Sequence, residues 1–80
     1  MFVKKDFELI FTDRLDCEHL LVQVRFKNIE LCEISKENGN DHMEIEMFCN
    51  DPLYNELNIK FPLDDFLEAL RVAKAKLMAL

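Results

Sequence analysis

Glycine and serine are nearly absent from this chain, whose 80 residues include one of each, Gly39 and Ser35. A glycine-rich loop that cradles a phosphate cannot be built from a single glycine, and a serine-based site has Ser35 alone to draw on. Tryptophan is missing altogether, and there are only two prolines. Because glycine and proline are so scarce, the sequence favours long regular elements joined by short turns.

Long apolar runs and paired cysteines are missing too. No stretch approaches the ~18 apolar residues of a membrane-spanning helix, and the segment Met1 to Asp6 lacks the apolar core of a signal peptide. The three cysteines, Cys17, Cys32 and Cys49, are an odd number without patterned spacing. This argues against a disulfide framework and predicts reduced, buried thiols. We therefore expect a cytoplasmic protein that makes no contact with a membrane.

The charge of the chain is negative and uneven. Half of the residues are hydrophobic, which is enough for the packed core of one domain that spans residues 1–80. The net charge is -6, and the stretch from Glu30 to Glu56 holds eight acidic residues against one basic residue, Lys36. Nothing forms a basic stripe, so direct binding of nucleic-acid phosphates is not expected. The acidic middle would favour a basic partner.

Apolar and polar residues alternate through most of the chain, which is the two-residue period of β-strands. Five strands are predicted, over Val3–Thr12, His19–Phe26, Ile29–Ser35, Met43–Cys49 and Glu56–Phe61. In the first of them, Phe7, Leu9 and Phe11 share one face. In the fourth, Met43, Ile45 and Met47 point inward. The sequence therefore predicts an antiparallel meander with one apolar face.

Two turns are predicted between these strands. Lys27-Asn28 is read as a two-residue hairpin turn, because Asn28 tolerates a positive φ. Its register sets Phe26 opposite Ile29 and Val24 opposite Leu31. On the other face Arg25 lies opposite Glu30, a favourable pair of charges. One long strand with a bulge at Lys27-Asn28 is the alternative. The second turn spans Glu37 to Asp41.

A helix is predicted from Leu63 to Met78, opened by Pro62. Acidic residues occupy its first turns and basic residues its end, which complements the helix dipole. Its apolar stripe consists of Leu63, Phe66, Leu67, Leu70, Ala73 and Leu77. Closing this stripe over the apolar face of the sheet gives an α+β fold, in which an antiparallel four- to five-stranded β-meander packs against one C-terminal α-helix.

The order of these signals from Val24 to Leu77 resembles that of small bacterial proteins of about this length. Two strands joined by a two-residue turn lead into Glu37-Asn38-Gly39-Asn40-Asp41-His42-Met43-Glu44-Ile45-Glu46. Then follows Lys60-Phe61-Pro62-Leu63-Asp64-Asp65-Phe66-Leu67, which runs into a helix rich in Ala and Leu. The resemblance rests mostly on turn and core positions. It implies the sheet-and-helix fold and no activity.

The acidic hairpin is the first candidate surface. It is formed by Glu30, Glu33, Glu37, Asp41, Glu44 and Glu46. Charged sheet edges commonly serve only solubility and protection from aggregation. The functional interpretation is a docking surface for a basic partner, as in inhibitors that mimic the charge of nucleic acid.

An apolar patch is the second candidate. The predicted strands place five apolar residues away from the core, namely Ile10, Leu21, Cys32, Ile34 and Phe48. In this register Leu21 lies opposite Ile34, and Cys32 lies near Phe48, so that a contiguous interface would form. The alternative is a bulge near Glu33, which would exchange Glu33 and Ile34 between the two faces.

The sequence predicts no catalytic residue, no cofactor and no metal site. The loop from Asp13 to His19 holds potential metal ligands in Asp13, Asp16, Cys17, Glu18 and His19. It lacks the paired Cys or His spacing of a metal site, so a solvated loop is predicted. A thiol paired with His19 or His42 would be the only nucleophile to consider.

The favoured hypothesis is a small non-enzymatic binding protein of the inhibitor or immunity-protein kind, which occludes a basic partner. The residues expected to bind that partner are Glu30, Glu37, Asp41, Glu44, Glu46, Phe48, Leu21 and Ile34. A homodimeric accessory domain is the alternative. A small enzyme or metal protein that uses the Asp13 to His19 loop is the third.

Overall fold

A computed structural model describes residues 1–13, 18–47 and 60–80 of the chain. The elements within these ranges are β1 (Phe2–Lys4), β2 (Phe7–Thr12), β3 (Leu21–Phe26), β4 (Ile29–Ser35), the 3-10 helix η1 (Asn40–His42), β5 (Glu44–Met47) and α2 (Leu63–Met78). Most of the predicted strand Glu56–Phe61 lies outside the described residues. So do Asp16, Cys17, Phe48 and Cys49.

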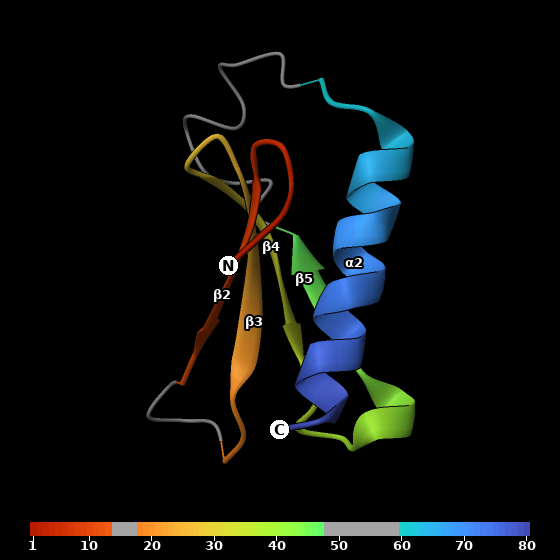
Figure 1. The fold of residues 1–80 in the computed structure, drawn as a ribbon. Coiled ribbons are helices and arrows are strands. Elements are labelled where there is room, and N and C mark those ends of the chain that lie inside the picture. The colour runs from red at the N-terminus through yellow and green to blue at the C-terminus, as the bar shows by residue number, and fades with distance from the viewer. Residues whose placement is uncertain (14–17, 48–59) are drawn as a thin grey trace.

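The five strands form one sheet in the order β1-β2-β3-β4-β5, and every neighbouring pair is antiparallel. The helix α2 packs along one side of this meander (Figure 1), and its contacts concentrate on β1, β2 and β3. The predicted α+β fold, with a meander packed against one C-terminal helix, is confirmed. The helix begins and ends where the sequence predicts.

The first strand differs from the prediction, because Val3–Thr12 is not one strand but most of a hairpin. β1 and β2 pair with each other, with Phe2 opposite Glu8. The turn between them uses Asp6 at a φ of 72°, a left-handed conformation that Asp tolerates better than most residues. Val3 and Phe7 have the same parity on either side of this turn, and the polar residues between them include no glycine or proline, so the pattern does not reveal it. Phe7 and Leu9 are buried, as predicted.

The hairpin between β3 and β4 is confirmed at its turn. Lys27 and Asn28 have φ angles of 48° and 69°, and two positive values in sequence are the mark of a type I′ turn. The predicted pairs Phe26 with Ile29 and Arg25 with Glu30 are both present. The alternative of one continuous strand is therefore wrong.

Beyond Glu30 the register shifts, and Val24 pairs with Cys32 instead of Leu31. One extra residue in β4, a β-bulge, accounts for the shift. The bulge brings Ile34 opposite Val22, on the core side. A bulge in β4 was the alternative considered above, and it lies slightly before Glu33.

The expected exposed patch is thereby corrected. Leu21, Cys32 and Ile34 are all buried. For Cys32 and Ile34 the reason is the bulge, which turns them onto the core face. Leu21 pairs with Thr12 of β2 and is buried as well. Ile10 is half-buried.

The core lies between α2 and the sheet, and four phenylalanine rings fill one end of it. Phe7 is fully buried, and its ring centroid lies 4.9 Å from that of Phe26, 5.4 Å from that of Phe61 and 6.1 Å from that of Phe66. Aromatic rings at such separations attract one another beyond the area they bury. This cluster joins β2, β3, the segment just before the helix and the first turns of α2.

The helix buries part of the predicted stripe, since Ala73 and Leu77 are buried and Phe66 and Leu70 are partly buried against the core. Ala69, Ala73 and Leu77 are its buried residues, whereas Leu63 and Leu67 are exposed. The small alanines allow the helix backbone to approach the sheet closely, so the contact face centres on them. Leu63 and Leu67 then fall to one flank of that face.

The buried side chain of Lys36 fastens the end of β4 to the end of α2. Its Nζ donates a hydrogen bond of 2.9 Å to the carbonyl oxygen of Leu77 and a second to the backbone oxygen of Leu80. These oxygens belong to the helix C-terminus, where the dipole is negative and a cation is favourable. The contact spans 41 residues of sequence and holds the helix against the sheet.

Candidate binding surface

Within the described residues, the core face of the sheet is left open at β5. Residues paired in an antiparallel sheet share a face, so Ile45, opposite Ile34, and Met47, opposite Cys32, belong to the core face. Both side chains are nevertheless exposed. The sequence correctly assigns them to the apolar face of the sheet. It does not reveal that α2 packs over the other half of that face.

The exposed leucines of α2 lie on the flank of the helix that points toward this open half. The pKa of Glu68 is lowered by its hydrogen bond with Arg71 and, to a smaller extent, by the charge of Lys4 in β1. The flank that carries Glu68 therefore lies toward β1. Leu63 and Leu67 are on the other side of the buried alanine row, so they lie toward β5.

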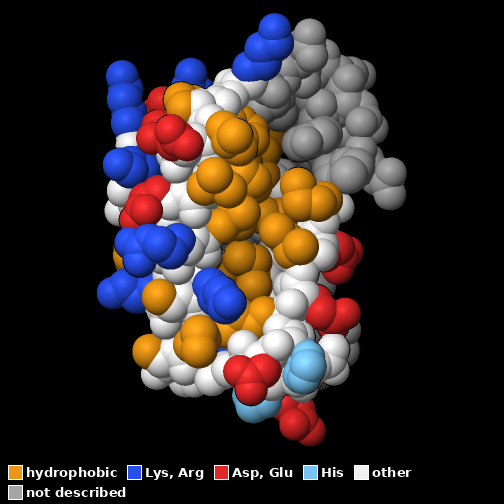
Figure 2. Space-filling view, turned by 90° about the vertical axis from the view of Figure 1, so that its right-hand side faces the viewer, with side chains coloured by type: hydrophobic (Ala, Val, Ile, Leu, Met, Phe, Trp, Pro, Cys, Tyr) orange, Lys and Arg blue, Asp and Glu red, His pale blue; other side chains and the backbone are white. Residues whose placement is uncertain are grey.

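Together these four side chains form what we call the apolar band. Their exposed fractions are 49% for Ile45, 42% for Met47, 66% for Leu63 and 51% for Leu67. Figure 2, which looks onto the side of α2 and β5, shows hydrophobic side chains gathered in a continuous band between charged side chains to either side. Scattered apolar residues are normal on a protein surface, whereas a contiguous patch with a polar rim is typical of an interaction site.

Acidic side chains occupy the opposite face of β5. Glu44 and Glu46 alternate with Ile45 and Met47, so they point to the outer face of the sheet. Glu46 lies directly opposite Glu33 of β4. Like charges directly opposite each other are destabilising in a sheet. Glu44 accepts a hydrogen bond of 2.7 Å from Asn38 Nδ2.

Glu33 itself is only 4% exposed and accepts a hydrogen bond of 3.1 Å from Gln23 Nε2. Three glutamates, Glu33, Glu44 and Glu46, thus share the outer face at the β4–β5 edge. We call this group the acidic edge. Glu44 and Glu46 are its exposed members, and they are the ones that a basic partner could reach.

The predicted site residues are divided by the fold. Glu44 and Glu46 lie on β5, with Asp41 nearby in η1 and Glu37 before it, and all four are exposed. Glu30 lies at the other end of β4, opposite Arg25. Leu21 and Ile34 are buried, and Phe48 lies outside the described residues.

The residues missed by sequence reasoning are Leu63 and Leu67, which were assigned to the core. One signal could have found them. The apolar positions of the helix extend round from Ala69 and Ala73 through Leu70 to Leu67, which is wider than one contact with a sheet requires. The excess width belongs to the apolar band.

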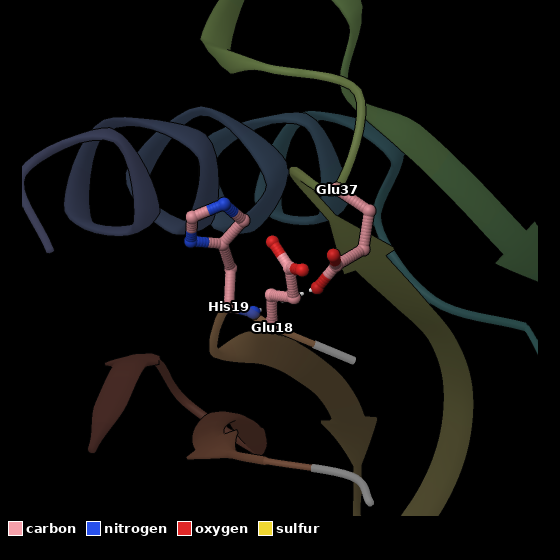
Figure 3. A group of neighbouring side chains, drawn as sticks. All are labelled: Glu18, His19 and Glu37. Atoms are coloured by element: carbon pink, nitrogen blue, oxygen red, sulfur yellow. Dashed lines mark hydrogen bonds between the residues drawn. The ribbon is translucent and has the colours of Figure 1, made fainter. Parts of the chain in front are cut away.

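A separate group of polar side chains joins the start of β3 to the end of β4 (Figure 3). The potential ligand atoms of Glu18, His19 and Glu37 all lie within 4.8 Å of one another, and all three residues are exposed. Glu37 Oε1 also accepts a hydrogen bond of 2.8 Å from the backbone N–H of His19. Three exposed ligands are fewer than the four of a structural zinc site. The visible role of Glu37 is to fasten the chain before β3.

Comparison of the chain with protein-family models, with curated proteins and with solved structures gave no match. Within the described ranges, no helix combines the length and the apolar character needed to cross a membrane. The apolar band and the acidic edge are therefore the features of the fold that bear on its function.

Proposed function

We propose that the protein is a small non-enzymatic binding protein that holds a basic protein partner against β5 and the neighbouring flank of α2. The observation that carries the proposal is the apolar band, because it consists of core-type side chains left exposed at the end of the sheet that α2 does not cover. A partner that covered the band would complete the second layer of the fold at this end.

The apolar band and the acidic edge contribute differently to such a complex. Burying the apolar band removes hydrocarbon surface from water and supplies affinity, at roughly 25 cal/mol per Å² before the costs of association. The acidic edge attracts a basic partner over distance, which raises the association rate and fixes its orientation. The net charge of -6 acts in the same direction. Occlusion of the partner's own basic surface would then be the effect of binding.

The proposal is tested by capturing partners from an extract of the host with the purified wild-type chain and with matched variants. Ile45→Asp and Leu67→Asp each place a charge in the apolar band. Phe2→Asp places the same charge at an exposed apolar residue of β1, the opposite edge strand. Circular dichroism confirms that each variant is folded.

The expected result is one basic protein recovered in stoichiometric amount by the wild type and by Phe2→Asp. Both variants in the apolar band should lose it. Equal recovery by all three variants would overturn the assignment of the surface. Recovery of nothing by the wild type, under conditions in which it is folded, would overturn the function.

A further inference from the structure

Resting on the proposed function, we infer the form in which the partner binds: it adds a β-strand to the edge of β5, and this strand alternates basic and apolar residues. The inference combines the outer edge of β5, with which none of the described strands pairs, with the alternation of charge along it.

The edge of β5 offers the backbone groups that such a strand needs. Among the described strands, β5 pairs with β4 and ends the sheet. A strand at the end of a sheet presents unpaired N–H and C=O groups on its outer side, and an extended peptide can satisfy them by strand addition. The other end of the sheet offers less, because β1 has three residues and an irregular register.

The side chains of β5 specify the chemistry of the added strand. Residues directly opposite one another share a face, so positions opposite Ile45 and Met47 would lie on the core face beside the apolar band. Those positions call for apolar side chains. Positions opposite Glu44 and Glu46 would lie on the outer face beside the acidic edge, and they call for Lys or Arg.

A second copy of this chain fits the same edge poorly. The β5 strands of two copies could pair antiparallel, with the core faces of both sheets on the same side of the joined sheet. Two kinds of register are then possible. One centres on Ile45 and sets Glu44 opposite Glu46 of the partner subunit. The other centres on Glu46 and sets it opposite its own equivalent. Either register adds facing glutamates to an edge that already holds three, so charge complementarity favours a basic segment.

The test uses three synthetic peptides as probes. The first repeats Lys-Val, the second has the same composition arranged as a block of Lys followed by a block of Val, and the third repeats Glu-Val. Binding to the full chain is measured by NMR titration, which also reports the backbone amides that shift. We expect the Lys-Val repeat to bind and to shift the amides of Glu44 to Met47. The block peptide should bind at least ten-fold more weakly, and the Glu-Val repeat should not bind.

Charge reversal tests the pairing itself. In the variant Glu44→Lys/Glu46→Lys, the Lys-Val repeat should lose at least ten-fold in affinity and the Glu-Val repeat should gain binding at β5. The matched control is Asp13→Lys/Glu18→Lys, which changes the net charge equally at exposed positions outside β5 and α2. This control should keep most of the affinity of the wild type for the Lys-Val repeat.

Three results would overturn strand addition. They are equal binding of the block peptide, an equal loss in the control variant, or the absence of any shift at β5. Self-association through β5 in sedimentation would overturn it in favour of a second copy. If the peptides fail while capture from the extract still depends on Ile45 and Leu67, strand addition fails and the proposed function stands.

Discussion

The buried ammonium of Lys36 at the end of α2 leads to a prediction about stability. The substitution Lys36→Met keeps a side chain of similar length and removes the charge and both hydrogen bonds, to Leu77 and Leu80. Hydrogen bonds to a charged group contribute about 1.5–3 kcal/mol, and a cation at a helix C-terminus about 0.3–1 kcal/mol. Burying the ammonium costs part of this gain. We expect the free energy of unfolding to fall by about 2 kcal/mol.

Thermal unfolding followed by circular dichroism measures the effect. For a domain of this size, 1 kcal/mol corresponds to about 4–8 °C, so the Tm should fall by roughly 8–16 °C. The control is Lys74→Met, which removes an exposed lysine from the same helix and should change stability by less than about 0.5 kcal/mol. If both variants melt alike, Lys36 does not hold the helix to the sheet and the reasoning is refuted.

Three further predictions follow from the packing. In urea unfolding, Phe66→Ala should lower the free energy of unfolding by about 3 kcal/mol and Leu67→Ala by less than about 0.5 kcal/mol. The reason is that Phe66 belongs to the aromatic cluster, whereas Leu67 is exposed. A larger loss for Leu67→Ala than for Phe66→Ala would mean that α2 packs through another face. Burial, together with the charge of Glu33, raises the pKa of the Cys32 thiol to about 11. Alkylation at pH 8 should therefore modify Cys32 only after unfolding, and rapid labelling of the native protein would contradict this. The stability that comes from keeping this thiol neutral is complete below about pH 9 and is lost as the pH rises through about 11. Because residue 28 has a positive φ, Asn28→Ala should lower the free energy of unfolding by about 1 kcal/mol, and Asn28→Gly should leave it unchanged or raise it. Equal stabilities of the two variants would count against the type I′ turn.

Local patterns were sufficient to predict the fold class, the β3–β4 turn and the bounds of α2. Each depends on residues close in sequence, such as Asn28 at a positive φ or the amphipathic period between Leu63 and Met78. The β1–β2 turn could not be predicted in this way, because Val3 and Phe7 have the same parity and no glycine or proline stands between them. In the fold this turn is linked to the β3–β4 turn, where Lys27 N donates a hydrogen bond to Asp6 O.

Features that depend on tertiary packing were beyond the sequence. The bulge in β4 moves Cys32 and Ile34 into the core, and no turn residue marks it. The burial of Lys36 depends on the helix end lying 41 residues further along the chain. The acidic half of the candidate site was predicted, because Glu44 and Glu46 alternate with the apolar residues of β5. Its apolar half was misplaced, because the position of α2 over β1, β2 and β3 decides which side chains remain exposed.

The central claim is that the open end of the sheet binds a basic partner, and amide hydrogen exchange tests it most directly. Exchange is compared between the free chain and its complex with the basic protein captured from the host. The account predicts that binding slows exchange at Glu44 to Met47 and in the first turns of α2, and leaves Phe2 to Lys4 unchanged. Slower exchange confined to β1, or no change along β5, would contradict it.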